Sequence, residues 1–385
     1  MTPLLSAEEA EHARALTDHI CAEVRAAGGW LSFERFMALA LYAPGLGYYS
    51  AGSEKIGVGG DFVTAPEMSD LFSRCVAAQC AEVLQDDGQI LELGAGTGRM
   101  AASVLTELAA RSCLPRRYAI LEVSADLAAR QRRRIAQLPE ALAERVVWLE
   151  RLPQRPFHGV ILANEVLDAL PCRRFIVQGE EVGELGVALE HERLVERSAP
   201  ADPQLVAEWG RLRGMVPAPL PDGYVSEMCL RVAPWLAGVT ESLERGMVLL
   251  LDYGLPRAHY YHPQRLTGTL RCHFKHRVHD DPYVNLGVQD ITAWVDFTRV
   301  AEAALECALE VAGFATQAAF LLGAGIQSYI AEAAGDAIEY ARRAGEARRL
   351  LLPGEMGEAF KVMALTRDLD QALSGFALQD LRGSL

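Results

Sequence analysis

Five short apolar segments constrain the fold of this chain most strongly. They lie at 89–94, 118–123, 146–150, 158–163 and 246–252. Helical patterns at about 98–111 and 124–138 occupy the first two intervals between them. Strands that alternate with helices in this way are typical of a parallel sheet in a doubly wound α/β protein. A helix from about 296 to 312 and two further strands, near 315–321 and 359–366, would complete a Rossmann-like sheet of seven strands.

The remaining segments surround this core. Residues 1–86 are expected to form a helical N-terminal lobe, with helices over 7–27, from Ser32 to Tyr42 and from Ala65 to about Leu84. A glycine-rich loop at 57–64 precedes the third helix and suits a lid over a ligand, although a plain connecting loop is the alternative. We expect the core to comprise 87–171 and 244–385, an α+β lobe to be inserted at 172–243, and an additional arm to lie at 255–295.

Charge and cysteine usage exclude several classes of protein. The chain carries 37 Lys and Arg against 51 Asp and Glu, a net charge of −14. A sequence-independent nucleic-acid binder needs a basic surface, so that class is excluded, whereas a cationic partner is favoured. The eight cysteines form no C-x-x-C pair, which indicates buried, reduced thiols. We find neither a signal-peptide pattern nor an apolar run long enough to span a bilayer, and therefore predict a cytoplasmic protein with no membrane segment.

A glycine-rich turn after the first apolar strand predicts a nucleotide-type site. Gly94, Gly96 and Gly98 let the backbone turn tightly and approach a ligand. Glu92 precedes them and suits an ammonium group, and Glu122 ends the next strand, where a carboxylate accepts hydrogen bonds from ribose hydroxyls. The third glycine comes one residue too early for the dinucleotide fingerprint, so S-adenosylmethionine fits better than NAD. A simple strand–helix turn is the plain alternative.

Polar residues also follow the fourth strand, in the segment 163–171. Loops at the carboxyl ends of strands form the ligand crevice in open α/β sheets. Asn164, Glu165 and Asp168 are therefore expected near any ligand that the glycine loop holds. The two acids could instead cap a turn at the surface.

Several motifs of this chain, and the order in which they occur, closely resemble those of one family. Taken together they are similar to the MidA-like S-adenosylmethionine-dependent methyltransferases, whose mitochondrial members are complex I assembly factors that methylate an arginine of a complex I subunit. The resemblance covers about residues 20–366, and one departure is Ala95, where many members carry proline. The motifs are the segments 60–67, 92–98, 122–124, 164–171, 252–254, 276–282, 289–297 and 356–360.

The resemblance implies a class I methyltransferase fold and assigns roles to residues. The three glycines would line the amino-acid end of the cofactor, Asn164 and Glu165 would face the transferred methyl group, and the loop 60–67 would close over the cofactor. The expected cofactor-binding residues are Gly60, Phe62, Thr64, Glu92, Gly94, Gly96, Gly98, Glu122, Val123 and Asn164.

An arginine acceptor needs carboxylates, because its guanidinium stays protonated and its charge is delocalised. Paired acids can orient the group and accept the released proton. We predict Glu165 as the main acceptor-orienting carboxylate with Asp168 or Glu67 as its partner. Glu227 and Asp252 are further acids that could reach the cleft. His279, on the arm, is expected to face the substrate, and a solvated position on the arm is the alternative.

The histidines of the arm do not predict a metal site. On a strand, His273 and His279 share one face while His276 points to the other, which divides the ligand set. No metal is therefore expected.

Methylation of an arginine in a protein partner is the leading prediction for function. Methylation of a small molecule on oxygen or nitrogen is the first alternative, although the insertion and the arm favour an extended peptide groove. A non-catalytic assembly chaperone that retains the cofactor is the second, and an NAD-dependent oxidoreductase is the competitor at the level of the fold. A monomer or a homodimer is expected.

Overall fold

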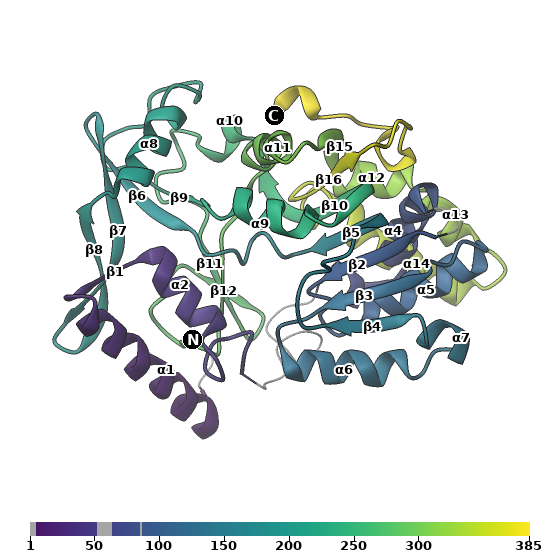
Figure 1. Cartoon of the computed structure of the whole chain (residues 1–385), viewed down its shortest axis with the longest axis horizontal. Helices are drawn as coiled ribbons and strands as arrows, with labels where there is room; N and C mark the ends of the chain where they lie inside the picture. Colours follow the sequence, from purple (N-terminus) through teal and green to yellow (C-terminus); the bar gives the residue numbers. More distant parts are fainter. Residues whose placement is uncertain (1–4, 52–63, 85–86) are drawn as a thin grey trace.

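A mixed sheet lies at the centre of the molecule (Figure 1). The computed structural model describes residues 5–51, 64–84 and 87–385. Within them the sheet follows the order β15-β16-β10-β5-β2-β3-β4, and a short strand, β14, pairs with β10. The strands are β2 (Gln89–Leu93), β3 (Arg117–Leu121), β4 (Val146–Leu149), β5 (Phe157–Asn164), β10 (Leu243–Leu255), β14 (Val295–Asp296), β15 (Glu310–Thr316) and β16 (Phe360–Arg367).

This sheet confirms the predicted fold class. Strands β4, β3, β2, β5 and β10 run parallel, whereas β16 is antiparallel to both of its neighbours, β10 and β15. The chain leaves β2 toward β3 and β4, then crosses back to β5 on the other side of β2. The carboxyl ends of β2 and β5 therefore form the switch point at which such folds bind ligands.

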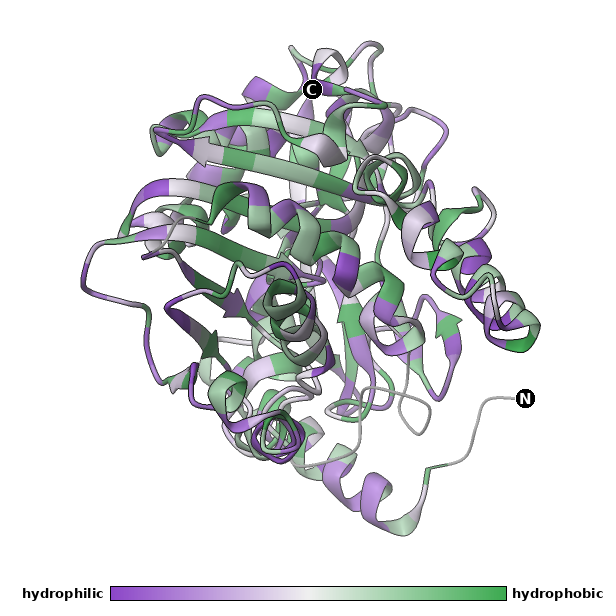
Figure 2. Ribbon diagram, turned by 90° about the vertical axis from the view of Figure 1, so that its right-hand side faces the viewer, coloured by the Kyte–Doolittle hydropathy of each residue, from purple (hydrophilic) through white to green (hydrophobic). Residues whose placement is uncertain are grey.

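Helices cover both faces of the sheet and bury its apolar side chains. One core joins the sheet to α4 (Asp70–Val83), α5 (Arg99–Ala110), α12 (Gln317–Gly323), α13 (Ile326–Ala331) and α14 (Ala337–Leu351). A second joins the other face to α9 (Val232–Thr240) and α11 (Phe297–Glu306). The long strands in the middle of the molecule are mostly green in Figure 2, as expected for a sheet covered on both faces. Across the described ranges, no helix has the length and apolar character needed to cross a membrane.

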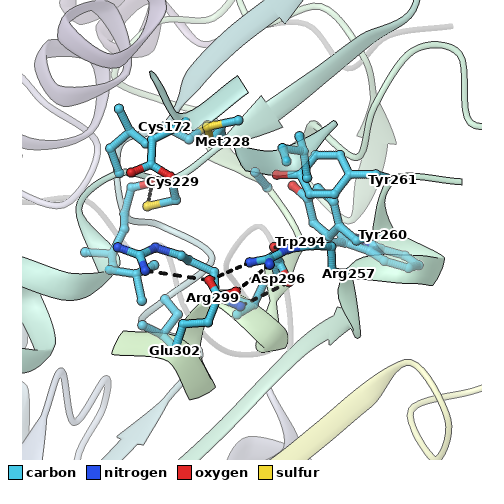
Figure 3. A pocket seen from close by; sticks show the side chains of 18 of the residues that line it. Cys172, Met228, Cys229, Arg257, Tyr260, Tyr261, Trp294, Asp296, Arg299 and Glu302 are labelled. Carbon is cyan, nitrogen blue, oxygen red and sulfur yellow. Dashed lines mark hydrogen bonds and ion pairs between the residues drawn. The ribbon is translucent and has the colours of Figure 1, made fainter. Parts of the chain in front are cut away.

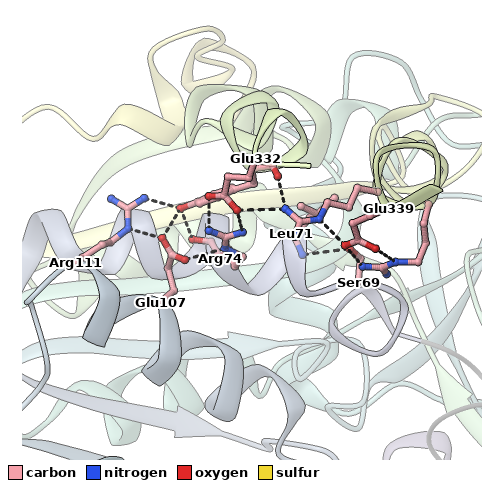
Figure 4. Close-up of polar contacts among 10 residues, drawn as sticks. Ser69, Leu71, Arg74, Glu107, Arg111, Glu332 and Glu339 are labelled. Carbon is pink, nitrogen blue, oxygen red and sulfur yellow. Dashed lines mark hydrogen bonds and ion pairs between the residues drawn. The ribbon is translucent and has the colours of Figure 1, made fainter. Parts of the chain in front are cut away.

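An ion-pair network fastens the helices of the first core to one another (Figure 4). The Glu107 carboxylate on α5 accepts hydrogen bonds from Arg74 Nε at 2.7 Å, Arg111 Nε at 2.8 Å and the Tyr329 hydroxyl at 3.0 Å. Arg74 also binds Glu332 through both of its terminal nitrogens. The network thereby links α4, α5 and α13.

An antiparallel sheet of five strands stands beside the central sheet (Figure 1). β1 pairs with β7 in the register Leu31↔Val187, so the N-terminal segment and the insertion at 172–243 share one sheet. The domain boundaries expected from sequence do not indicate this sharing. The elements are α1 (Ala7–Ala26), β1 (Trp30–Ser32), α2 (Phe33–Tyr42), β6 (Arg173–Gln178), β7 (Glu181–Glu190), β8 (Arg193–Pro200), α8 (Pro203–Leu212) and β9 (Val225–Met228).

The arm after β10 forms a small sheet of its own. Its strands β11 (Arg271–Phe274), β12 (Arg277–His279) and β13 (Asp290–Thr292) follow the short helix α10 (Arg257–Tyr260). The other short elements are α3 (Ala65–Met68), α6 (Ala125–Ile135), α7 (Glu140–Ala143), η1 (Ser374–Phe376) and η2 (Arg382–Ser384).

Three sequence-based predictions of elements were wrong in part. The strand expected near 315–321 ends at Thr316, whose side chain accepts the Ala319 N–H and so caps α12. The helix expected to reach residue 312 ends at Glu306, and Ala308 then takes a positive φ of 53°. The helix expected from Ala65 to Leu84 is interrupted at Ser69, which is extended and caps α4. In each case a side-chain cap or one backbone reversal overrides a continuous apolar pattern.

Candidate active site

A cavity of about 480 Å³ opens at the carboxyl ends of β2 and β5. Its volume lies within the range usual for sites that bind small molecules and cofactors, roughly 300–1,000 Å³. Among the residues expected from sequence to bind the cofactor, those in its lining are Thr64, Glu92, Gly94, Gly96, Glu122, Val123 and Asn164. Gly60 and Phe62 lie outside the described residues.

The glycine loop takes a backbone conformation that favours glycine. Gly94, Gly96 and Gly98 have φ values of 63°, 54° and 81°. Gly98 does not line the cavity but precedes α5 as its N-cap. A Cβ there would lie 3.1 Å from the Cα of Gln131, so the third glycine also lets α6 approach the loop.

Glu122 and Gln131 form a hydrogen-bonded unit beside this loop. The Glu122 carboxylate accepts the Ser124 N–H at 2.9 Å and the Gln131 amide at 2.9 Å. That amide also donates to the Gly96 carbonyl at 2.9 Å, and its oxygen accepts the Trp148 indole N–H at 3.0 Å. Burial raises the pKa of Glu122. The carboxylate is thus fixed in orientation with its remaining lone pairs available to a diol.

Glu92 is the second buried acid of the cofactor end. It is 1% exposed and its Oε2 accepts the Tyr118 hydroxyl at 2.8 Å. Burial raises its pKa to about 7, against the opposing effect of the Tyr118 hydrogen bond. An ammonium group would compensate the buried carboxylate, so this residue fits the amino-acid end of S-adenosylmethionine.

Glu165 lies at the same switch point, directly after β5. Its backbone is left-handed, with φ 52°, which is uncommon for a residue other than glycine and typical of functional positions. The N–H of Glu165 donates to the Leu251 carbonyl at 2.9 Å, and the Asn164 amide reaches its Oε1 at 3.3 Å. The side chain keeps part of its surface open to the cavity. Its enclosure by protein, followed by the charge of Asp168, raises its pKa to about 8.

Comparison with known proteins agrees with this cavity. A family model described as that of S-adenosyl-L-methionine-dependent methyltransferases matches residues 75–315. The chain belongs to this methyltransferase family. A solved structure of a COG1565 superfamily member from Burkholderia thailandensis, bound to S-adenosyl-homocysteine, is 40% identical and has a TM-score of 0.95, with 100% of both chains covered. The cofactor predicted from sequence is thereby confirmed as S-adenosylmethionine.

More distant relatives carry a more specific name. A Drosophila melanogaster protein named protein arginine methyltransferase NDUFAF7 homolog, mitochondrial, is 28% identical over 376 residues, which are 88% of this chain and 82% of the relative. The Danio rerio protein arginine methyltransferase NDUFAF7, mitochondrial, is 24% identical over 391 residues, with 91% and 87% covered. These relatives support the MidA-like resemblance.

The other acids predicted for the methyltransferase site differ in their placement. Glu67 lines the cavity, but its carboxylate accepts the Thr97 hydroxyl and its carbonyl accepts Arg99 Nη1 at 2.7 Å. These contacts hold Glu67 against the glycine loop. Asp168 does not line the cavity, is 5% exposed, and accepts the Tyr253 hydroxyl through Oδ2.

Asp252 and Glu227 do not line the methyltransferase cavity and hold backbone groups instead. The Asp252 carboxylate accepts the N–H groups of Leu167 at 2.9 Å and Asp168 at 3.2 Å, so it braces the loop after β5. Glu227 lies on β9 and accepts the Thr269 N–H at 2.7 Å. Because their carboxylate oxygens accept backbone N–H groups, the two acids fix the positions of neighbouring loop residues.

A second pocket lies behind the loop of Asp168, between α8, α10 and α11 (Figure 3). Its free volume is about 50 Å³, which suits a few waters rather than a cofactor. Arg257 binds Glu302 through two contacts of 2.5 and 2.7 Å and Asp296 at 3.3 Å. The charges at this pocket therefore compensate one another, unlike those of the larger cavity.

His279 lines neither of these two pockets. It lies on β12 and pairs with Cys272, and its Nδ1 lies 3.3 Å from the Asp281 nitrogen. Its predicted contact with the substrate stays a prediction. Within 5–51, 64–84 and 87–385, no three His, Cys, Asp or Glu side chains are grouped to hold a metal ion.

Sequence reasoning missed the part played by Gln131. The available signal was its position on α6, because Leu127, Gln131 and Ile135 follow one another at helical spacing and all three are buried. An uncharged polar residue on an apolar stripe needs a buried partner, which here is Glu122 together with the glycine loop.

Proposed function

We propose that this methyltransferase modifies an arginine side chain of a protein partner. The observation that carries the proposal is the position of Glu165 at the cofactor cavity. Four acids line that cavity, namely Glu67, Glu92, Glu122 and Glu165. Arg99 is the one basic residue among the described lining residues, and it binds Asp70 at 3.3 Å and the Glu67 carbonyl. A cationic acceptor suits such a cavity. The names of the distant relatives support the same substrate class.

The chain's own residues supply positioning and a proton acceptor. Bound S-adenosylmethionine supplies a methyl carbon that bonds to the acceptor nitrogen while its bond to sulfur breaks, with the electron pair left on sulfur. The nitrogen must also lose one proton, and in this proposal Glu165 accepts it. A guanidinium beside Glu165 favours the ionised carboxylate, so substrate binding itself lowers the pKa of this group.

The proposal predicts a pH dependence that Glu165→Gln removes. Because the pKa of Glu165 is raised to about 8 in the free enzyme, kcat/KM for the acceptor at saturating S-adenosylmethionine rises about tenfold per pH unit below that value and then levels. Glu165→Gln flattens this limb and lowers transfer by about a hundredfold or more, while the affinity for S-adenosylhomocysteine stays within about threefold.

The assay uses purified protein, methyl-labelled S-adenosylmethionine and a set of arginine-containing peptides with matched lysine peptides. Mass spectrometry identifies the modified atom, and the exposed substitution Glu355→Gln is the matched control. Methylarginine formed by wild type and lost with Glu165→Gln supports the proposal. Label on small molecules or on other residues, or a wild-type rate with Glu165→Gln, contradicts it.

A further inference from the structure

Two stacked tyrosines form a wall of the cofactor cavity. Tyr42, at the end of α2, and Tyr49 both line it. Their ring centroids are 5.6 Å apart with an interplanar angle of 22°. Tyr48, which is fully buried, packs edge-on behind Tyr49 at 5.1 Å. The N-terminal segment therefore contributes an aromatic surface to a cavity whose other lining residues come mostly from the central sheet and its loops.

Hydrogen bonds from the two hydroxyl groups fix the orientation of both rings. The Tyr42 hydroxyl donates to the Ala169 carbonyl at 2.9 Å, in the same loop as Glu165. The Tyr49 hydroxyl donates to Asp290 Oδ2 at 2.9 Å. Asp290 is 2% exposed and begins β13, and its Oδ1 accepts the N–H of Ile291 at 2.9 Å. Both rings are thus held through their hydroxyl groups, and the Asp290 carboxylate that holds Tyr49 is itself fixed by the Ile291 N–H.

The surroundings of the tyrosine pair are negative. The charges of Asp168 and Asp290 raise the pKa of both phenols, after burial itself, so the hydroxyls remain donors. Asp290 also contributes to the raised pKa of Glu165, after burial and Asp168. Aromatic faces beside carboxylates form the environment that binds organic cations, because ring quadrupole and negative charge attract the same group.

We propose that the Tyr42–Tyr49 pair is the acceptor-binding wall of the active site, that it takes a planar cationic group, and that Asp290 is the positioning residue for the Tyr49 ring. The inference rests on the proposed function, since a guanidinium is the planar cation that an arginine presents. The acceptor group then lies between the tyrosine wall and the Glu165 carboxylate. Arginine stacks on aromatic faces more readily than lysine does, so the wall also selects between the two cations.

The test measures binding of small probes to the protein saturated with S-adenosylhomocysteine. N-acetylarginine methylamide is compared with N-acetylcitrulline methylamide, a neutral probe of nearly the same shape, and with N-acetyllysine methylamide. Wild type is expected to bind the arginine probe at least about tenfold more tightly than the citrulline probe. Tyr42→Leu and Tyr49→Leu are each expected to weaken arginine binding by about three- to thirtyfold, the range of a cation–π contact. Tyr340→Leu, on the exposed face of α14, is the control.

The role of Asp290 is tested by a double-mutant cycle. Tyr49→Phe and Asp290→Ala each remove one end of the same hydrogen bond, so their effects on arginine affinity are not additive. The affinity for S-adenosylhomocysteine reports correct folding and stays within about threefold in every variant. Should Asp290→Ala fail to fold, the two leucine variants still decide the assignment of the wall.

The outcomes separate this inference from the proposed function. A wild-type protein that does not prefer arginine over citrulline contradicts both. A wild-type preference that Tyr42→Leu and Tyr49→Leu leave intact overturns the wall while the proposed function stands. A loss of S-adenosylhomocysteine affinity with an unchanged arginine preference assigns the tyrosines to the cofactor and also overturns the inference.

Discussion

Replacement of Glu122 by glutamine should weaken cofactor binding through a conflict of hydrogen-bond donors. The carboxylate accepts two donors, the Ser124 N–H and the Gln131 amide. The Gln131 amide cannot turn round at no cost, because Gly96 accepts from its nitrogen and Trp148 donates to its oxygen. In Glu122→Gln the new NH₂ group must therefore face one of the two donors, whichever way the new amide is turned.

The magnitude follows from the bonds that are lost. A ribose diol donates two hydrogen bonds to an ionised carboxylate, and each bond to a charged group contributes about 1.5–3 kcal/mol. Glutamine retains one acceptor oxygen, so the loss corresponds to about one such bond. We expect the dissociation constant for S-adenosylhomocysteine to rise by about ten- to a hundredfold.

Calorimetric titration measures this change, and an analogue of S-adenosylhomocysteine without the 2′-hydroxyl tests its cause. If Glu122 binds the ribose, the analogue binds wild type and Glu122→Gln with more similar affinities than the complete product does. Asp126→Asn, at the start of α6 and outside the cavity lining, is the control. An equal loss of affinity for both ligands would refute the contact with the ribose.

Two further predictions concern pH and stability. Because Glu92 has a pKa of about 7 and the ammonium group of the ligand requires its ionised carboxylate, the affinity for S-adenosylhomocysteine should fall about tenfold per pH unit below that value. The Glu92→Gln variant should bind S-adenosylhomocysteine weakly and without this pH dependence. A wild-type affinity that does not change between about pH 6 and 8 contradicts the binding of the ammonium group by Glu92. Glu107→Gln should lower the free energy of unfolding by about 2 kcal/mol in urea, relative to Glu355→Gln. Burial opposes ionisation of Glu107, but Arg74 and Arg111 outweigh it and lower its pKa, so this stabilisation is present above the usual carboxyl pKa and is lost as the pH falls through the folded value. If the difference in the free energy of unfolding between Glu107→Gln and wild type is the same in acid as at neutral pH, that account is contradicted.

Local patterns predicted the cofactor half of the site. β2 and β5 are nearly continuous runs of buried residues, and the glycines and Glu122 follow strands directly. Such features depend on residues close together in sequence, so periodicity and turn chemistry reveal them. The strand near 315–321 was misplaced because the run from Phe314 to Leu322 is buried in large part as the end of a strand and then as a helix, and apolar residues alone do not distinguish the two.

The acceptor half could not be predicted in the same way. Asp290 lies 241 positions from Tyr49, and no local spacing connects it to the Tyr42–Tyr49 pair. The pairing of β1 with β7 likewise joins residues 30–32 to 186–188. The sequence also placed Asp168 at the cavity, whereas its carboxylate accepts from Tyr253 behind the loop. A position directly after a strand predicts that a residue lies at one edge of the sheet, but it does not predict the direction of the side chain.

The bond between Tyr49 and Asp290 spans 241 positions of the chain. A ribosome releases Tyr49 long before the carboxylate that holds its ring, since synthesis proceeds from the N-terminus. Glu92, Gly94, Gly96 and Glu122 lie close together in the sequence, and Glu165 follows soon after them. The nascent polypeptide thus contains these residues of the cofactor end while the aromatic wall still lacks its anchor, so the acceptor wall is completed later in synthesis than they are.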